Sequence, residues 1–258
     1  MFIEKILNDS IGNTDLVVVG SEYCIYPCLR CEQDAASISR FLTPIVEESY
    51  MDSIYKKILK LCNNKNLKVS FNDWGLLYKC KSLINKGNVI PVIGRILSRS
   101  ILDCPWYENI FQSENDKKLL AGLNIDHEAK LSFLKSIGVN EIEINFQISE
   151  FVKNVSKEIL VTTYLSNRLI SVSRNCFSRD LFQDNSTKCD DMFCDNRIDF
   201  TLEKKLSRKK QLYEEATEVD KAYFDNMFIQ GKAVYKKENL SLSDISPEIY
   251  HSVIMDIE

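Results

Sequence analysis

The sequence predicts an α/β fold in which parallel strands form a TIM-barrel-like structure. Three observations point to it: apolar, β-branched runs alternate with segments of helical periodicity, the chain has 258 residues, and 45% of them are hydrophobic. Strands and helices that alternate at this rhythm build parallel sheets, and barrels of this type commonly occupy about 250 residues. The same composition excludes a disordered chain.

The strands of the barrel are expected at short apolar runs bounded by turn residues or charges, the pattern of buried parallel strands. No such run is obvious before residue 15, because residues 1–14 are short and polar, so the sequence leaves open whether the barrel is complete. The expected strands are residues 15–20, 41–46, 67–71, 89–93, 141–145, 159–163 and 169–172.

Helices are expected between several of these strands. Tyr50, Ile54, Ile58 and Leu61 recur at helical spacing and predict an amphipathic helix over 50–62. Two further helices are predicted over 75–85 and 126–137, ending near Gly87 and Gly138.

The last part of the chain has a different character. Residues 227–235 predict a strand pair around Gly231, and residues 203–225 predict a charged helix or a flexible segment. We therefore expect a barrel-like domain over 1–200 that carries the cysteine cluster, with a helical and strand extension over 201–258 packed on it.

Charge and hydropathy limit the classes of function. The net charge is −4, so no global basic field attracts nucleic acid. A basic run at 204–210 is more simply an exposed helix face, because acidic residues follow it. No apolar stretch is long enough to span a bilayer, and residues 1–7 do not resemble a signal peptide. Glycine is scarce, and neither GxGxxG nor GxxxxGK[ST] occurs. We therefore expect a cytoplasmic protein, and the missing glycine-rich motifs disfavour nucleotide-dependent enzymes.

The nine cysteines are the most unusual part of the composition. An odd number without an export signal argues against a disulfide framework and favours metal or cluster ligation. Cys62 and Cys80 fall in helical patterns and are most simply small buried apolar residues. Cys104 is assigned no role. The remaining six form two groups, Cys24, Cys28 and Cys31, and Cys176, Cys189 and Cys194.

The first group has a C-x3-C-x2-C spacing after an expected strand. This is the spacing by which radical S-adenosylmethionine enzymes hold three irons of a [4Fe–4S] cluster, although the glycine-rich strand end of those enzymes is missing here. Three closely spaced cysteines could equally be half of a zinc site. The first group thus leaves both alternatives open.

The second group has the spacing C-x12-C-x4-C and begins after Ser171-Val-Ser-Arg-Asn. Three upstream elements precede it in order: Val17-Val-Val-Gly-Ser-Glu-Tyr-Cys24, Phe71-Asn-Asp-Trp-Gly75 and Val92-Ile-Gly-Arg-Ile-Leu97. Together they resemble the collagenase-like peptidase family, in particular its iron–sulfur branch, UbiU and UbiV. The resemblance covers roughly residues 15–195 and depends on the order of the elements more than on any one of them.

The resemblance implies that Cys24, Cys176, Cys189 and Cys194 hold a [4Fe–4S] cluster, and four thiolates are the usual ligand set of such a cluster. A zinc site or unligated thiols are the plain alternatives. It also implies oxygen-independent hydroxylation of a small aromatic, prenylated or nucleobase substrate. Asp73 and Arg95 would position the substrate, although a helix cap and a barrel salt bridge explain them about as well.

Some features depart from the family pattern. Gln147 stands where relatives often carry an acidic residue, no histidine precedes Cys176, and Cys28 and Cys31 are additional. Peptidase chemistry is not expected, because the two histidines are isolated and no HExxH motif occurs.

Two other hypotheses remain beside the hydroxylase. The chain could be a non-catalytic, cluster-bearing subunit that forms a heterodimer with a second family member. It could also be a radical S-adenosylmethionine enzyme that uses the first cysteine group.

In a barrel, the residues after strand ends gather at one mouth. The residues expected there are Cys24, Asp73, Arg95 and Cys176.

Overall fold

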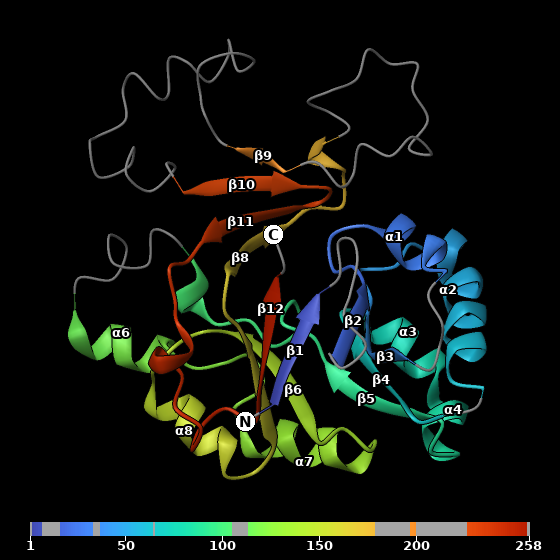
Figure 1. The fold of residues 1–258 in the computed structure, drawn as a ribbon. Coiled ribbons are helices and arrows are strands. Elements are labelled where there is room, and N and C mark those ends of the chain that lie inside the picture. The colour runs from blue at the N-terminus through green and yellow to red at the C-terminus, as the bar shows by residue number, and fades with distance from the viewer. Residues whose placement is uncertain are drawn as a thin grey trace.

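A computed structural model describes residues 2–6, 16–32, 37–63, 65–104, 113–178, 197–199 and 226–256. Parallel strands close into a barrel in the order β1-β12-β7-β6-β5-β4-β3-β2, which confirms the predicted α/β barrel (Figure 1). The barrel is irregular, because β5 and β6 share only two residue pairs in register. Its strands are β1 (Phe2–Ile6), β2 (Leu16–Gly20), β3 (Ile38–Leu42), β4 (Leu67–Phe71), β5 (Val89–Ile93), β6 (Glu141–Asn145), β7 (Leu160–Tyr164) and β12 (Ser252–Asp256).

Most predicted strands lie where the apolar runs placed them. β4, β5 and β6 have the predicted bounds, and β2 and β7 differ by one residue. β3 begins earlier than predicted and ends at Leu42, before Pro44. Proline has no N–H to donate to a ladder, so the strand cannot continue through it as the apolar pattern suggested.

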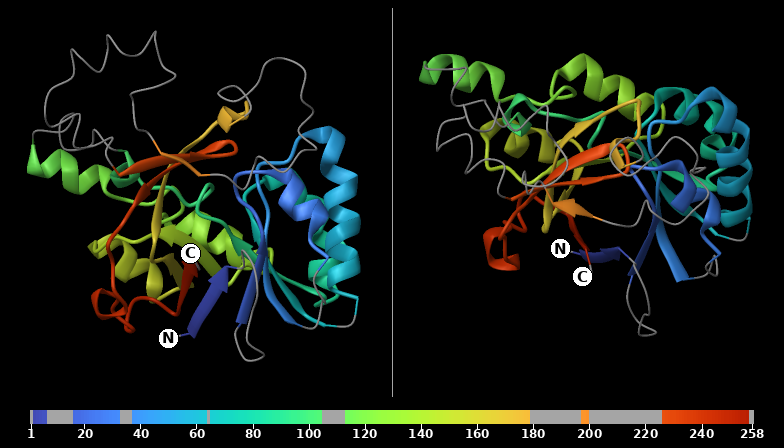
Figure 2. Two further views of the ribbon diagram at one scale, coloured as in Figure 1. Left: turned by 45° about the horizontal axis from the view of Figure 1, so that its top comes forward. Right: turned by 90° about the horizontal axis from the view of Figure 1, so that it is seen from above.

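The two ends of the chain lie side by side in the barrel wall (Figures 1 and 2). β1 pairs with β12 from Phe2↔Ser252 to Ile6↔Asp256, and β1 also pairs with β2. The sequence left open whether a strand precedes β2, and the structure shows that β1 does. The boundary at residue 200 needs correction, because β12 belongs to the barrel and not to an extension packed on it. A closed barrel leaves no strand edge unpaired. Closure therefore favours the pairing of β1 and β12, although neither segment has a strong strand pattern in the sequence.

The run at 169–172 is a strand, but it lies outside the barrel. β8 (Asn167–Val172) pairs antiparallel with β11 (Ala233–Lys237) in a sheet of order β8-β11-β10-β9. The other members are β10 (Met227–Gln230) and β9 (Ile198–Asp199). The β10–β11 hairpin confirms the strand pair predicted around Gly231. Figure 2 shows this sheet from above, across one end of the barrel. The charged segment 203–225 lies outside the described residues.

Helices pack around the outside of the barrel (Figure 1). The predicted helix over 50–62 is α2, and it buries Ile54, Ile58 and Leu61. The predicted helix over 75–85 is interrupted at Cys80 and forms two short helices. The helices are α1 (Ile25–Arg30), α2 (Glu48–Leu61), α3 (Trp74–Lys79), α4 (Lys81–Asn85), α6 (Glu114–Leu120), α7 (Glu128–Ser136) and α8 (Glu150–Ser156), with short 3-10 turns η2 (Ile101–Asp103) and η4 (Leu242–Asp244).

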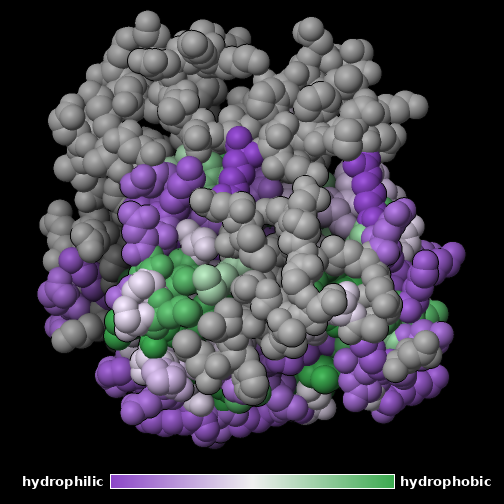
Figure 3. Space-filling view, viewed as in Figure 1, coloured by the Kyte–Doolittle hydropathy of each residue, from purple (hydrophilic) through white to green (hydrophobic). Residues whose placement is uncertain are grey.

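The surface of the described residues is mixed in character. Hydrophilic side chains cover most of the lower part of the molecule, and apolar side chains form smaller areas between them (Figure 3). No helix in the described ranges has the length and apolar character needed to cross a membrane.

Charged side chains occupy the interior of the barrel. Arg40 is fully buried and donates to the carboxylates of Glu141 and Glu143, with 2.7 Å to Oε1 of Glu143. Lys68 approaches the other oxygen of Glu141 at 2.8 Å, and Tyr164 donates to Glu143 at 2.8 Å. This network joins β3, β4, β6 and β7 below the mouth.

Candidate functional site

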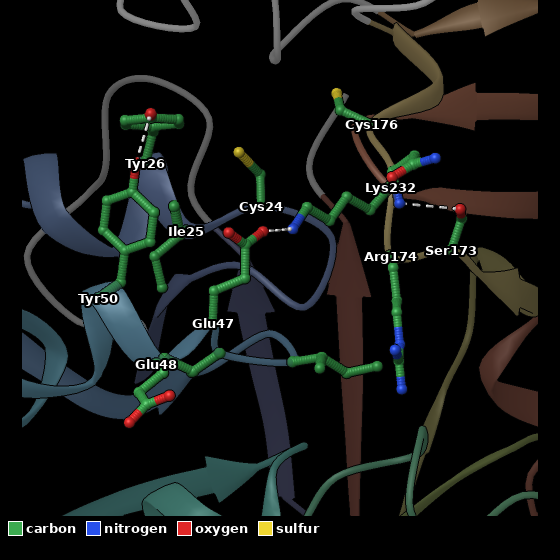
Figure 4. A pocket seen from close by; sticks show the side chains of 13 residues that line it. Cys24, Ile25, Tyr26, Glu47, Glu48, Tyr50, Ser173, Arg174, Cys176 and Lys232 are labelled. Atoms are coloured by element: carbon green, nitrogen blue, oxygen red, sulfur yellow. Dashed lines mark hydrogen bonds and ion pairs between the residues drawn. The ribbon is translucent and has the colours of Figure 1, made fainter.

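A cavity of about 640 Å³ opens at the carboxyl ends of the barrel strands. The loops after β2 and β3 form one wall, and the segment after β8 with the β10–β11 hairpin forms the other (Figure 4). Cys24 lies on the first wall and Cys176 on the second. The cavity therefore brings together one residue from each of the two cysteine groups. The full lining is Cys24, Ile25, Tyr26, Ile45, Val46, Glu47, Glu48, Tyr50, Ser173, Arg174, Asn175, Cys176 and Lys232.

A tight turn after β2 directs Cys24 to the cavity. Gly20 has a φ of 88°, and a Cβ there would collide with the carbonyl oxygen of Leu42. The Ser21 hydroxyl then accepts the backbone N–H groups of Tyr23 and Cys24, both at 3.1 Å. Cys24 is the N-cap residue of α1 and is buried. These bonds fix the backbone on both sides of Glu22.

Cys176 reaches the cavity from the other wall. It follows β8, within a segment in which Ser173 and Ser178 hydrogen-bond to the β10–β11 hairpin. Cys189 and Cys194, the other two predicted ligands, lie outside the described residues. No group of three or more His, Cys, Asp or Glu side chains in the described ranges could hold a metal ion. The structure thus places two of the four predicted cluster ligands at one cavity.

The first cysteine group does not converge, although all three of its members are described. The Cys28 thiol donates to the carbonyl oxygens of Leu42 at 3.3 Å and Ser21 at 3.5 Å, so it faces the core. Burial raises the pKa of Cys28 to about 12, which keeps this thiol protonated. Cys24, Cys28 and Cys31 therefore do not form the triad that a radical S-adenosylmethionine enzyme needs.

Arg95 lies at the barrel mouth after β5, but its guanidinium is occupied. Its Nε donates to both carboxylate oxygens of Glu22, at 3.0 and 2.9 Å, and its Nη1 donates to Asn145 at 3.0 Å. The guanidinium carbon stacks 3.6 Å from the ring centre of Tyr164. Burial alone would lower the pKa of Arg95, but the Glu22 carboxylate outweighs this effect and raises it.

Asp73 lies after β4 and caps a helix. Its Oδ1 accepts the N–H of Leu76 at 2.9 Å, as an N-cap residue of α3 does, and its Oδ2 accepts the N–H of Val46 at 3.4 Å. Asp73 and Arg95 thus make the two contacts expected of a cap and a salt bridge. Neither Asp73 nor Arg95 is among the described residues that line the cavity.

Several side chains at the site were not anticipated from the sequence. Lys232 and Glu47 form an ion pair of 2.6 Å across the cavity, and Tyr26 and Tyr50 share a hydrogen bond of 3.0 Å between their hydroxyls. The sequence contained no signal for these pairs, because each joins segments that only the fold brings together. The buried acids of β6 had a signal, namely the alternation of polar and apolar residues in Glu141-Ile-Glu-Ile-Asn145.

Gln147 is a further residue that the sequence singled out. It is buried after β6, and its side-chain amide has no hydrogen-bond partner in the described part of the chain. Its backbone N–H is held by the Tyr250 hydroxyl at 3.2 Å. The position at which the resemblance would expect an acidic group is thus a neutral amide inside the protein.

The chain matches no protein-family model, no curated protein and no solved structure. The resemblance to the collagenase-like peptidases therefore depends on the motifs alone. The site itself is a cavity at the mouth of a parallel barrel, with a cysteine on each of two opposite walls.

Proposed function

We propose that this chain is an iron–sulfur protein in which Cys24, Cys176, Cys189 and Cys194 hold a [4Fe–4S] cluster at the barrel mouth. By its resemblance, it would serve oxygen-independent hydroxylation of a small aromatic, prenylated or nucleobase molecule in the cytoplasm. The observation that carries the proposal is the meeting of Cys24 and Cys176 at one cavity. These two residues belong to different cysteine groups, and both line the same cavity, as two ligands of one cluster must.

Two of the four proposed donors, Cys24 and Cys176, are described, and both line the cavity. Iron–sulfur clusters are held by cysteine thiolates, and the cavity is lined by two cysteines with aromatic and charged side chains around them. When bound, a [4Fe–4S] centre would supply one-electron redox chemistry at this mouth.

The residues around the cavity would bind and orient a substrate. Tyr26 and Tyr50 offer aromatic rings on one wall, and Arg174 offers a cation on the other. The Lys232–Glu47 ion pair crosses between the walls and would restrict access to the cysteines. These groups suit a planar molecule with an anionic substituent.

Anaerobic purification and reconstitution, followed by iron and sulfide analysis, test the proposal. We expect about four irons per chain and a brown, oxygen-sensitive protein. Cys24→Ser, Cys176→Ser, Cys189→Ser and Cys194→Ser should each lose most of the iron. Cys104→Ser is the matched control and should keep it, because Cys104 is not part of the proposed ligand set.

Two results would contradict the cluster. Stoichiometric zinc without iron after reconstitution would identify a zinc site. Full iron content in both Cys24→Ser and Cys176→Ser would show that the cavity cysteines are not ligands.

A second candidate function is a cluster-bearing subunit that acts with another family member. The occupied state of Arg95 and Asp73 favours it, because both predicted substrate-positioning residues already have structural partners. Under this hypothesis the isolated chain binds the cluster but hydroxylates nothing. Co-purification with a second barrel protein, and activity only in the mixture, would support the subunit; activity of the isolated chain would rule it out.

A further inference from the structure

The tip of the β10–β11 hairpin, Gly231 and Lys232, is bonded to both cysteine-bearing segments of the cavity. The backbone N–H of Lys232 donates to the carbonyl oxygen of Tyr23 at 3.0 Å, next to Cys24. The carbonyl oxygen of Lys232 accepts the N–H of Ser173 at 2.8 Å. One residue of the tip therefore connects the wall that carries Cys24 with the wall that carries Cys176.

Gly231 adds two bonds on the Cys176 side. Its N–H donates to the Ser178 hydroxyl at 2.8 Å, and its carbonyl oxygen accepts the N–H of Ser178 at 3.2 Å. Cys176 thus lies in a segment that is held at both ends, at Ser173 and at Ser178. A segment fixed at two nearby points keeps its intervening side chain in a narrow range of positions.

The contact between Gly231 and the Cys24 segment is close enough to require glycine. Gly231 has a φ of 58°, in the left-handed region. A Cβ at this position would lie 2.7 Å from Cδ2 and 2.9 Å from the carbonyl oxygen of Tyr23, and 3.5 Å from Cβ of Cys24. Any larger residue must push the Cys24 segment away from the hairpin.

A second layer of contacts stiffens this arrangement. Gln230 donates to the Tyr23 hydroxyl at 2.9 Å, and Tyr235, on β11, donates to Glu22 at 3.0 Å. Glu22 is in turn bound to Arg95 on the barrel. The hairpin is therefore anchored to the barrel mouth through the same loop that carries Cys24.

From these contacts we propose that the hairpin tip sets the separation between the Cys24 and Cys176 sulfurs, and that Gly231 is a positioning residue for the cluster. This inference rests on the proposed function. It gives the small antiparallel sheet the role of positioning Cys176. The barrel wall cannot do this, because Cys176 follows β8, which lies outside the barrel. Groups that orient metal ligands commonly change metal affinity when they are altered, although they do not touch the metal.

The test compares two glycines with a left-handed backbone. Gly87 has a φ of 75°, and a Cβ at this position would meet no atom within 4 Å, so Gly87→Ala carries backbone strain without a collision. Gly231→Ala carries similar strain and also displaces the Cys24 segment. Each variant is purified and reconstituted without oxygen, its fold is checked by circular dichroism, and its iron content, reduction potential and rate of iron loss to a chelator are measured.

We expect Gly87→Ala to match the parent chain in all three cluster properties. Gly231→Ala should fold, show a shifted reduction potential and bind the cluster roughly 10–100-fold more weakly. Ser178→Ala is the milder second variant, because it removes one bond to the tip without a collision, and its cluster should be lost faster than that of the parent. If Gly231→Ala does not fold, Ser178→Ala alone tests the positioning role of the hairpin tip.

The outcomes separate the two proposals. If the parent chain binds no iron–sulfur cluster, the proposed function fails and the positioning role fails with it. If the parent binds the cluster and both Gly231→Ala and Ser178→Ala behave like Gly87→Ala, only the positioning role is overturned.

Discussion

Arg95 and Glu22 form a buried ion pair at the barrel mouth, in which Nε of Arg95 donates to both carboxylate oxygens, at 3.0 and 2.9 Å. The pair connects the end of β5 to the loop that carries Cys24. Each member has a further partner, since Arg95 donates to Asn145 and Glu22 accepts from Tyr235. An arginine satisfied in this way holds the mouth together and has little capacity left for a substrate carboxylate.

The first prediction concerns the stability that this pair provides. Arg95→Ala leaves the Glu22 carboxylate buried without its main partner, and we expect a loss of about 3–5 kcal/mol in the free energy of unfolding. Urea denaturation measures the loss. In the double variant Glu22→Gln/Arg95→Ala the loss should be smaller than the sum of the two single losses. An Arg95→Ala protein of unchanged stability that no longer binds a carboxylate ligand would instead assign Arg95 to the substrate.

The second prediction separates the two roles of Asp73. If the side chain acts as a helix cap, Asp73→Asn retains most of the stability, whereas Asp73→Ala loses about 1 kcal/mol, because asparagine accepts the capping hydrogen bond and alanine cannot. Thermal unfolding of both variants gives the comparison. A normally stable Asp73→Asn protein without hydroxylation, in conditions where the parent is active, would show that the carboxylate has a chemical role.

The third prediction is a pH dependence that originates inside the barrel. Burial alone would raise the pKa of Glu141, but Arg40 and Lys68 outweigh this effect and lower it from 4.5 to about 2. A lowered pKa means that this carboxylate stabilises the folded chain above pH 4.5 and that the contribution is lost as the pH falls toward 2. At ~1.4 kcal/mol for each pKa unit, the contribution is about 3 kcal/mol.

Comparison of the parent chain with Glu141→Gln separates the pH-dependent contribution of Glu141 from that of Glu143. Burial raises the pKa of Glu143, so Glu143 acts in the opposite direction, favouring the folded state at lower pH. The difference in unfolding free energy between the parent and Glu141→Gln should therefore shrink as the pH is lowered below 4.5. A difference that stays constant over this range would refute the assignment.

The fourth prediction concerns thiol reactivity. Burial raises the pKa values of Cys28 and Cys80 to about 12, so both remain protonated and enclosed in the folded chain. Iodoacetamide at about pH 8 should leave them unmodified, while the more accessible Cys31 reacts. Peptide mass spectrometry before and after urea unfolding gives the readout. Rapid native labelling of Cys28 would place its thiol at the surface and reopen the question of whether the first cysteine group binds iron.

The sequence alone determined the class of fold and most of the barrel wall. The runs at 67–71, 89–93 and 141–145 are strands with the predicted bounds. Their apolar residues follow strand patterns, alternating with polar residues in 67–71 and 141–145 and continuous in 89–93. It also placed Cys24, Asp73 and Arg95 directly after strands, where a parallel barrel gathers its mouth residues. The spacing of the cysteines predicted two groups, but the first of them does not converge in the structure.

Tertiary structure decided how the barrel closes and what the mouth residues contact. β1 and β12 have weak local signals and become strands because each completes the hydrogen bonds of the other. β8 reads as a barrel strand from its composition, but its antiparallel pairing with β11 takes it to the sheet above the mouth. Arg95 finds its partners, and Cys24 meets Cys176, through contacts between residues far apart in the chain. Hydrophobic periodicity in the sequence describes only residues that are close together in the chain, so it could not predict these contacts.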